Sequence, residues 1–458
     1  MFVNRKKELR VLTERLRSRR AELIILYGRR RVGKTELIRS FLKGKRHIYY
    51  MADRRTEAEQ LEIFSALLGE YAGDDIITTQ PLQNWDLVFK YIEARTKKRG
   101  FILLVLDEFP YLVETSPALP SILQRHWDQH LKEMNVFIIL CGSSMSFMEK
   151  EILSYKSPLY GRRTGQLEIL PFSYREAHEM FPTLSTEQLI AFYAVFGGVP
   201  AYLECINPAK SLWRNIEEQV FPSDRFLHNE VTFLLMEELR TPQNYFAILR
   251  ALAFGKTRIN DIVQFTGLER GVVGKYLDNL IELRIVERKV PVTEHPTKSR
   301  KGIYLIRDHY FRFWFRYIYP HLTYLEEGRY AMVLEKIRKD FPAFLGPVFE
   351  QVCRDFLNAH QEKIPIQFSS LGSWWDKGEE IDIVAANEKG EMLLGECKWS
   401  NKKVGTNIFL QLKEKHRFLS AQGRKFSYMM FSKSGFTDEM KRLASDENVS
   451  LVELSQLV

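Results

Sequence analysis

Eight residues between an apolar segment and a helical segment constrain this chain more than any others. The stretch from Gly28 to Thr35, GRRRVGKT, fits the pattern GxxxxGK[ST]. Residues 22–27 before it are almost wholly apolar, as in a buried strand, and residues 36–42 after it have a helical pattern. Gly28 and Gly33 let backbone N–H groups turn toward a phosphate, and the positive end of the following helix faces the same anion. A chance glycine turn is the alternative, but the flanking strand and helix favour a phosphate-binding loop.

The side chains of this loop and of a second segment suit Mg²⁺-dependent phosphoryl transfer. Lys34 is expected to reach the β- and γ-phosphates of a nucleotide, and Thr35 to ligate Mg²⁺. The apolar run 101–106 ends in Asp107 and Glu108. Two acids at the end of a buried strand need a reason, because buried charge is costly. We expect Asp107 to hold the Mg²⁺ shell and Glu108 to orient or deprotonate the attacking water; an exposed acidic strand end is the alternative.

Two later polar segments supply further candidates for the same site. Ser143 follows the apolar run 136–142, where a hydroxyl can sense the γ-phosphate or hold the attacking water. A plain strand-to-helix cap is the alternative, because serine is a good N-cap residue. Arg162 and Arg163 are candidates for an arginine finger, which stabilises charge on the transferring phosphoryl group. A solvated basic loop is the alternative for these two arginines.

Short, almost continuously apolar strands alternate with helical segments over the first part of the chain. We expect the strands in 22–27, 46–52, 101–109 and 136–144. Such strands, separated by helices, indicate a parallel sheet covered on both faces. The sequence therefore predicts an α/β protein whose N-terminal part is a P-loop αβα sandwich.

The order of motifs resembles that of a known family. NRKKEL, GRRRVGKT, LLVLDEF, GSS, LYGRRT, LPFSYREA and GGVPAYL are together similar to the archaeal and bacterial ATPases related to AAA+ and STAND NTPases, over most of 1–330. The resemblance implies that Asn4 and Arg5 lie near the adenine. It also implies that the Gly197–Pro200 turn belongs to a helical lid against the nucleotide. It does not decide whether Arg162 or Arg163 is the finger, or whether the finger acts in cis or in trans.

The middle of the chain is basic and has a winged-helix pattern. Residues 244–306 have the order helix, helix, helix, strand, basic turn and strand, and Gly267 suits a tight helix-turn-helix corner. Residues 241–320 hold 14 Lys and Arg but 7 Asp and Glu, which is most of the chain's net charge of +9. Phosphate contacts to DNA are expected from Arg270, Lys275, Lys298, Arg300 and Lys301. A rigid packing or interaction module is the alternative.

The aromatic run 310–319, YFRFWFRYIY, admits two interpretations. A base-stacking platform is one of them. Its density favours the other, a buried helix that packs against neighbouring parts of the protein.

Carboxylates and a lysine are grouped near the C-terminus. Residues 381–385, IDIVA, alternate with period two, and residues 391–398, EMLLGECK, are expected to form the return strand after an NEKG turn. Glu396 and Lys398 are two positions apart and therefore share a face of their strand, and Asp382 lies on the paired strand. An Asp, a Glu and a Lys that converge in this way can hold Mg²⁺ beside a scissile phosphate.

This pattern resembles the PD-(D/E)xK nucleases. Asp382 and Glu396 would bind metal, Lys398 would position or activate the water and offset phosphate charge, and Glu350 matches the helical glutamate of that superfamily. Gln411 follows in a helix, where such enzymes often keep a Gln or Lys. Ile381 stands before Asp382 in place of proline, a departure that many active members share. A hairpin salt bridge of Glu396 to a neighbouring lysine is the alternative, and a fold does not guarantee its activity.

We therefore expect four parts and two kinds of ligand. The parts are a P-loop ATPase core (1–172), a helical lid (173–240), a winged helix (241–330) and a restriction-endonuclease-like α/β domain (331–458). ATP and Mg²⁺ are the expected cofactors, with Mn²⁺ an alternative at the C-terminal site. Nucleotide contacts are expected from Asn4, Arg5, Gly28, Arg29, Arg30, Arg31, Val32, Gly33, Lys34, Thr35 and Ser143.

Composition limits the class of protein and its partners. The four cysteines form no CxxC pair, so neither a disulfide framework nor a cysteine zinc site is expected. No apolar run approaches the roughly 18 residues of a membrane span, and the N-terminus has no apolar signal core. We expect a soluble, cytoplasmic protein without a membrane partner. Its partner is DNA, or alternatively RNA, and self-association would follow if the arginine finger acts in trans.

Three functions agree with these features. The first is a Mg²⁺-ATPase that controls a DNA-binding winged helix and a C-terminal nuclease. The second is a slow, STAND-like regulatory switch whose nuclease-like fold only binds DNA or protein. The third is an assembly ATPase that has no nucleic-acid partner. Metal-dependent cleavage separates the first from the second, and salt-dependent DNA affinity separates both from the third.

Overall fold

The computed structural model describes residues 3–239, 241–419 and 425–457. It divides into two compact units. The first contains Met1–Pro171 and Val199–Ala201, and the second contains Phe172–Gly198 and Tyr202–Val458. Each unit is described by itself.

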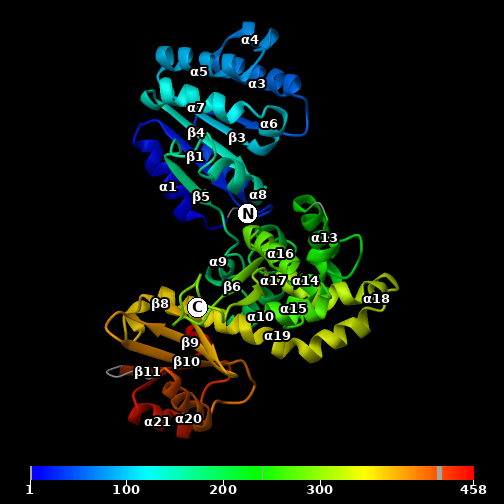
Figure 1. Cartoon of the computed structure of the whole chain (residues 1–458), viewed down its shortest axis with the longest axis vertical. Coiled ribbons are helices and arrows are strands. Elements are labelled where there is room, and N and C mark those ends of the chain that lie inside the picture. Colours follow the sequence, from blue (N-terminus) through cyan, green and yellow to red (C-terminus); the bar gives the residue numbers. More distant parts are fainter. Residues whose placement is uncertain (1–2, 240, 420–424, 458) are drawn as a thin grey trace. The chain divides into compact units, whose positions relative to one another are not determined.

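The first unit is built on a five-stranded parallel sheet with the order β2-β3-β4-β1-β5. The sheet and its helices are blue to cyan-green in Figure 1. Its strands are β1 (Glu22–Tyr27), β2 (Ile48–Met51), β3 (Ile102–Asp107), β4 (Val136–Gly142) and β5 (Gly165–Glu168). Its helices are α1 (Lys6–Arg17), α2 (Lys34–Leu42), α3 (Glu57–Ala72), α4 (Asp75–Thr79), α5 (Trp85–Arg99), α6 (Phe109–Thr115), α7 (Leu119–Gln129) and α8 (Met145–Phe147).

Helices cover both faces of this sheet because its strands are apolar on both faces. On one face, Leu12 of α1 and Phe41 of α2 pack in one core with alternate strand residues such as Val105. On the other face, the ring centroid of Tyr50 lies 5.5 Å from that of Phe64 on α3. The expected parallel αβα sandwich is confirmed, whereas the edge strand β5 was not foreseen.

The second unit begins with a helical segment. Its helices are α9 (Tyr174–His178), α10 (Thr186–Phe196), α11 (Pro200–Leu203), which the unit boundary crosses, α12 (Leu212–Gln219) and α13 (Phe226–Glu238). Gly198 is required after α10, because a Cβ there would lie 1.8 Å from the carbonyl oxygen of Phe172. The Phe172 N–H donates to the Gly198 carbonyl at 2.7 Å. This hydrogen bond holds the start of the helical segment against the glycine turn.

Three helices and a two-stranded antiparallel sheet follow. They are α14 (Gln243–Ala253), α15 (Ile259–Thr266), α16 (Arg270–Glu282), β6 (Val286–Lys289) and β7 (Ile303–Ile306). Gly267 has φ of +70° and ends α15, as a tight corner requires. The elements lie where we expected them, and the assignment to a winged helix stays a prediction.

The aromatic run forms buried helical structure, which confirms the second interpretation of this segment. It spans α17 (His309–Phe313), a π-helical turn (Trp314–Ile318) and a 3₁₀ turn (Tyr319–His321). Phe311, Trp314 and Phe315 are fully buried. Because their rings pack inside the unit, they offer no base-stacking platform.

The C-terminal part is a mixed five-stranded sheet with the order β12-β11-β10-β9-β8. The short α18 (Leu322–Glu326) and the 30-residue α19 (Tyr330–Ala359) precede it; both are yellow in Figure 1. Phe409 of α20 and Met440 of α21 pack with Val384 and Leu394 in one core. Phe356 of α19 meets Phe431 of β11 with 6.3 Å between the ring centroids. The elements are β8 (Ser370–Asp376), β9 (Glu379–Ala386), β10 (Glu391–Lys398), α20 (Thr406–Lys415), β11 (Lys425–Ser432), α21 (Asp438–Asp446) and β12 (Val449–Glu453).

The expected hairpin at 379–398 is present, with β9 and β10 antiparallel. The expected boundaries at residues 240 and 330 stay predictions. Among the helices of the described residues, none has the length and hydropathy that a membrane crossing requires.

Candidate functional site

The phosphate-binding loop joins β1 to α2 and holds the side chain of Lys34 against its own backbone. The Nζ atom of Lys34 donates to the carbonyl oxygens of Gly28 at 2.8 Å and Arg29 at 2.9 Å. Burial lowers the pKa of Lys34, while the carboxylates of Glu108 and Asp107 act in the opposite direction. The ammonium group of Lys34 therefore lies where its positive charge and its N–H donors could contact an anion bound in the loop.

The glycines of the loop have specific steric reasons. A Cβ at Gly28 would lie 2.3 Å from the carbonyl oxygen of Ile169, the residue after β5. Gly33 has φ of +89° and directly precedes α2, a backbone conformation that favours glycine. Arg31 also has a positive φ, of 70°, and Val32 is fully buried. The loop is thus fixed between the sheet and α2.

The carboxylate of Asp107 collects hydroxyl groups at the end of β3. Its Oδ2 atom accepts from Thr35 Oγ1 at 3.2 Å and from the Tyr49 hydroxyl at 2.8 Å. Its Oδ1 atom accepts from the Glu108 N–H at 2.9 Å. Burial and Asp107 raise the pKa of Tyr49 above its usual range, so Tyr49 stays a donor. A hydroxyl and a carboxylate oxygen are hard ligands of the kind Mg²⁺ prefers, so Thr35 and Asp107 fit the expected ion.

Tyr49 was missed by sequence reasoning. It lies on β2, and Met51 of β2 is paired with Asp107. No motif marks Tyr49, and only the adjacency of β2 and β3 in the sheet would have pointed to it.

Glu108 is held by Ser143, which lies directly after β4. The Ser143 Oγ atom lies 2.6 Å and 2.7 Å from the two carboxylate oxygens of Glu108, and its hydroxyl donates to that carboxylate. Ser143 is 3% exposed, and Glu108 has φ of +52° at the start of α6. For a residue other than glycine this conformation is uncommon and clusters at functional sites. Ser143 therefore orients the carboxylate, and its side chain makes no cap hydrogen bond to a helix in these contacts.

Arg5 contacts the loop backbone. Its Nη2 atom donates to the carbonyl oxygens of Val32 at 2.8 Å and Leu170 at 2.7 Å, and the residue is 3% exposed. Asn4 and Arg5 both have positive φ, of 61° and 63°. The place near the adenine that the resemblance implied stays a prediction, while these contacts show that Arg5 supports the loop.

The two arginine-finger candidates lie in the turns before β5. Arg162 pairs with Asp128, with Nη2 and Oδ2 3.1 Å apart. Arg163 donates to the Leu153 carbonyl at 3.0 Å. Arg30 of the loop donates to the Tyr111 hydroxyl at 3.3 Å. The finger role of Arg162 or Arg163 stays a prediction.

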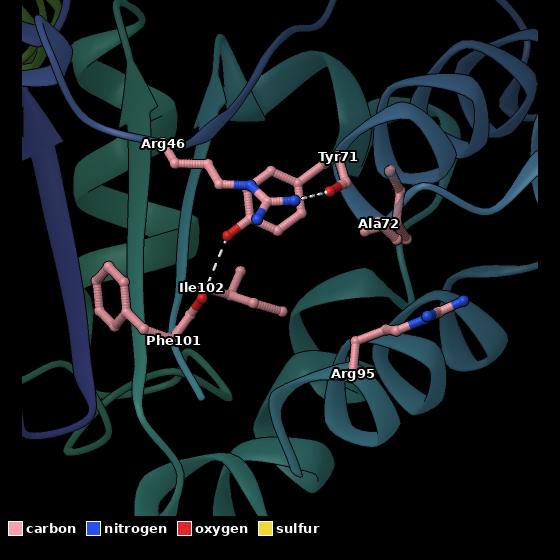
Figure 2. Close-up of a pocket in the computed structure, with 7 residues that line it drawn as sticks. Arg46, Tyr71, Ala72, Arg95, Phe101 and Ile102 are labelled. Carbon is pink, nitrogen blue, oxygen red and sulfur yellow. Dashed lines mark hydrogen bonds between the residues drawn. The ribbon is translucent and has the colours of Figure 1, made fainter. Parts of the chain in front are cut away.

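A small cavity of about 220 Å³ lies at the opposite, amino-terminal edge of the same sheet (Figure 2). The Arg46 guanidinium lies over the Tyr71 ring at 4.5 Å and donates to the Tyr71 carbonyl. The Tyr71 hydroxyl donates to the Phe101 carbonyl at 3.2 Å. Its lining residues include none of the loop, so this cavity is separate from the nucleotide site.

The C-terminal carboxylates come together at the β9–β10 hairpin. Gly395 of β10 pairs with Ile383 of β9. Because the strands are antiparallel, the next residue of β10, Glu396, lies opposite the preceding residue of β9, Asp382. Asp382 Oδ2 accepts from the Cys397 N–H at 2.8 Å. Burial and the nearby charges of Glu396 and Glu350 raise the pKa of Asp382 to about 7.

The basic residues around these carboxylates are partly unexpected. Lys398 donates to Glu396 Oε1 at 2.5 Å; burial lowers its pKa, but this bond and the Glu396 charge raise it overall. Lys415 of α20 lies 3.8 Å from Glu396 Oε2. Arg354 of α19 donates to the Asp382 carbonyl at 2.9 Å and lies 3.5 Å from Glu350. Arg354 and Lys415 were missed, because only the packing of α19 and α20 on the hairpin brings them there.

The fit to a metal is limited at this second site. Glu396 Oε2 is buried without a hydrogen-bond partner in the part of the chain that the structure describes, and the ammonium of Lys415 already lies 3.8 Å from it. Within the same residues, no group of three or more His, Cys, Asp or Glu is close enough to hold a metal ion. Asp382, Glu396 and Glu350 thus have the right donor atoms, and their metal role stays a prediction.

The five residues expected to contact nucleic acid differ in whether their charges are already paired with carboxylates. Arg270, Lys275, Lys298 and Arg300 are exposed, and Arg270 donates to Asn260 at 3.0 Å. Lys301 differs from the other four, since its Nζ atom pairs with Glu294 at 3.1 Å and Asp376 at 3.2 Å. Two carboxylates already neutralise its charge, and a phosphate contact of any of the five stays a prediction.

Comparison with known proteins identifies two matching regions. Residues 2–206 match a family described as an ATPase domain predominantly from Archaea. Residues 314–414 match a family described as archaeal and bacterial proteins of unknown function.

Two relatives and one solved structure are similar to this chain. An uncharacterized protein of Methanocaldococcus jannaschii is 38% identical over 412 residues, which are 88% of each chain. An uncharacterized ATP-binding protein of the same organism is 61% identical over 46 residues, 10% of this chain and 78% of that one. A Walker-type ATPase of Pyrococcus abyssi has a TM-score of 0.52 at 21% identity, over 69% of this chain and 96% of that one; this similarity shows the fold.

The contacts of Arg5 give a prediction about the loop. Arg5→Ala should lower the free energy of unfolding by about 2–4 kcal/mol, because it removes charged hydrogen bonds to two carbonyls. It should also weaken ATP binding. Denaturant unfolding and nucleotide titration measure the two effects. Arg10→Ala, on the helix α1 that follows Arg5, is the control, since the Arg10 side chain is 70% exposed. Weaker ATP binding without lost stability in Arg5→Ala would contradict the supporting role.

Proposed function

This chain belongs to the archaeal ATPase family, and from that premise we propose that it hydrolyses ATP with Mg²⁺ and couples hydrolysis to binding and cleavage of DNA. The observation that carries the hydrolytic part is the pair of carboxylates at the end of β3. Asp107 accepts from Thr35, and Glu108 accepts from Ser143. These contacts support a role of Asp107 with a cation and of Glu108 with water, the two roles that hydrolysis of a triphosphate requires.

The residues of the loop bind and orient the triphosphate. Lys34 exchanges the carbonyls of Gly28 and Arg29 for phosphate oxygens, which are stronger acceptors because they are charged. Thr35 and Asp107 would hold Mg²⁺, and the bound ion would offset the charge that develops on the phosphates. Arg5 keeps the Val32 carbonyl in place while the anion binds.

Glu108 acts on the attacking water. Its carboxylate accepts the water's hydrogen and turns an oxygen lone pair toward the γ-phosphorus. Ser143 donates to the same carboxylate, so it sets the direction in which Glu108 points. An arginine, Arg162 or Arg163, stabilises the charge of the transition state.

The second unit supplies the nucleic-acid functions in this proposal. The exposed Arg270, Lys275, Lys298 and Arg300 contact phosphates. Asp382 and Glu396, on paired strands of the hairpin, would hold a metal ion beside a scissile phosphodiester, with Glu350 of α19 as the third carboxylate. Lys398 carries its proton and offsets phosphate charge, because its contact with Glu396 favours the ammonium form.

A second candidate function is an ATP-driven regulatory switch. The lack of a compact three-carboxylate group among the described residues favours it. In this case the hairpin site and the basic surface bind DNA or protein without cleaving it, and hydrolysis resets the bound state.

Two substitutions separate ATP binding from hydrolysis. Lys34→Ala should weaken ATP affinity at least about tenfold, because it removes a charged donor to the phosphates. Glu108→Gln should leave affinity within about twofold and lower turnover about 100-fold or more. A fluorescent-nucleotide titration and a phosphate-release assay measure them. Lys43→Ala and Glu114→Gln, both exposed, are the matched controls; unchanged turnover in Glu108→Gln would remove Glu108 from the mechanism.

Removal of two exposed charges tests DNA binding. The double variant Lys298→Ala, Arg300→Ala should bind duplex DNA more weakly, and the slope of log affinity against log salt should fall by about 0.9 for each lost phosphate contact. Fluorescence anisotropy at several salt concentrations measures this slope. Lys389→Ala, in the exposed turn between β9 and β10, is the control. A slope that does not change would place the DNA contact elsewhere.

Cleavage distinguishes the two candidate functions. Labelled single-stranded, double-stranded and branched DNA and RNA should be cut with Mg²⁺ or Mn²⁺, and Asp382→Asn or Lys398→Ala should reduce the rate about 100-fold or more, as expected for loss of electrostatic stabilisation. Lys403→Ala, an exposed lysine outside the hairpin, should cut normally. If the wild-type chain hydrolyses ATP and cuts none of these substrates, the regulatory switch is the better account.

A further inference from the structure

The second unit contains a cavity of about 640 Å³ that none of the proposed roles uses. This volume lies within the range of about 300–1,000 Å³ that is typical of small-molecule and cofactor sites. Its walls come from the end of α14, from β6 and β7, from the aromatic segment, from α19, and from β8 and β9.

Most of the charges in its lining neutralise one another. Arg316 pairs with Asp340 at 2.8 Å and Lys289 with Glu287 at 2.9 Å. Arg354 lies 3.5 Å from Glu350. Three charged residues remain: Arg307, Arg312 and Glu380.

The two remaining arginines lack carboxylate partners. Arg312 donates to the Phe344 carbonyl, and its guanidinium lies 4.1 Å from the centre of the Phe344 ring. Burial lowers the pKa of Arg312 to about 10, so it stays charged at neutral pH. Arg307 is exposed, and among the described residues neither arginine makes an ion pair. A partly buried cation without a counter-ion favours an anionic ligand.

The rest of the lining suits an aromatic ligand that has hydrogen-bonding groups. Trp375, Leu305 and Pro347 supply apolar surface. His309 also lines the cavity; it is 7% exposed, and its Nδ1 atom is buried without a hydrogen-bond partner in the part of the chain described. A buried nitrogen without a partner calls for an explanation such as an absent ligand or water.

The cavity borders the hairpin carboxylates. Glu350 and Arg354 line it, and Arg354 donates to the Asp382 carbonyl at 2.9 Å. A phosphate held in the cavity would therefore place the adjoining phosphodiester of a strand toward Asp382.

We propose that this cavity binds one nucleotide unit of an unpaired nucleic-acid strand, with the phosphate at Arg307 and Arg312 and the base along the wall of Trp375 and His309. A base in a duplex reaches a concave site only after it leaves the stack, so single strands and frayed ends are the substrate class. A free mononucleotide has the same chemistry. The proposal deepens, and rests on, the nucleic-acid binding proposed for this unit.

The test uses the full chain with its P-loop saturated by ADP and Mg²⁺. A fluorescein-labelled decathymidylate is titrated by anisotropy, with a blunt duplex and thymidine 5′-monophosphate as competitors. Ala343→Trp fills the cavity from an exposed position on α19 and should weaken binding of the single strand at least tenfold. Arg307→Ala should weaken it several-fold and lower the salt slope by about 0.7, the value for one phosphate contact to a single strand.

Arg442→Ala is the control, because Arg442 is an exposed arginine of α21 that does not line the cavity. If thymidine 5′-monophosphate displaces the labelled strand from the wild-type chain but not from Ala343→Trp, the cavity is supported as a nucleotide site. Its ligand would then include free nucleotides. If the duplex binds as tightly as the single strand, or if both variants keep the wild-type affinity, the proposal that the cavity binds an unpaired nucleotide is wrong. DNA binding elsewhere on this unit would still stand. If the wild-type chain binds neither strand nor duplex, the proposed nucleic-acid binding fails with it.

Discussion

The buried carboxylate of Asp107 is the interaction on which the first unit depends. It is 1% exposed, and a buried ion is tolerated only where donors surround it. Those donors come from three places in the sequence: Thr35 at the start of α2, Tyr49 on β2, and the backbone of Glu108. The strand order β2-β3-β4-β1-β5 brings them together, because adjacent parallel strands end at the same edge of the sheet. The same edge also brings Ser143 to Glu108, so the sheet that satisfies the buried charge also builds the proposed catalytic site.

The second unit solves a different electrostatic problem, since its positive charge is concentrated in residues 241–320, which hold 14 Lys and Arg but 7 Asp and Glu. Part of that charge is neutralised internally, as in the pairs of Lys301 with Glu294 and of Arg316 with Asp340. The remaining positive charge of this segment lies at exposed positions of its helices and of the turn between β6 and β7, and at Arg307 and Arg312 of the large cavity. The acids at the hairpin lie beside this cavity through Glu350 and Arg354. A polyanion on this unit would thus lie close to both cations and carboxylates.

The parts of the site that sequence predicted are those in which neighbouring residues define the chemistry. The GRRRVGKT loop carries its own strand and helix, and Asp107 and Glu108 follow their strand directly, so local spacing was sufficient. The hairpin of Asp382 and Glu396 was predictable for the same reason, because a four-residue turn joins strands that alternate with period two. The buried aromatic helix followed from composition alone.

The residues that sequence did not reveal act across the fold. Tyr49 reaches Asp107 only because β2 and β3 are neighbours, and Arg5 reaches Val32 only because α1 packs beside α2. Arg354 and Lys415 come to the carboxylates from two helices that lie on the hairpin. Lys301 forms an ion pair with Asp376, 75 positions away in the sequence. A count of charges along the sequence could not predict this pair. The large cavity likewise needs contributions from seven elements, none of which has a motif.

A crystal structure of the chain with Mg²⁺ and a non-hydrolysable ATP analogue tests the central claim most directly. The account predicts that Lys34 Nζ leaves the carbonyls of Gly28 and Arg29 for phosphate oxygens. It also predicts that Mg²⁺ takes Thr35 Oγ1 or Asp107 within its ligand shell, at about 2.0–2.1 Å for direct contacts. A nucleotide bound away from this loop, or bound here while Lys34 keeps both carbonyl contacts, would contradict the assignment of the site.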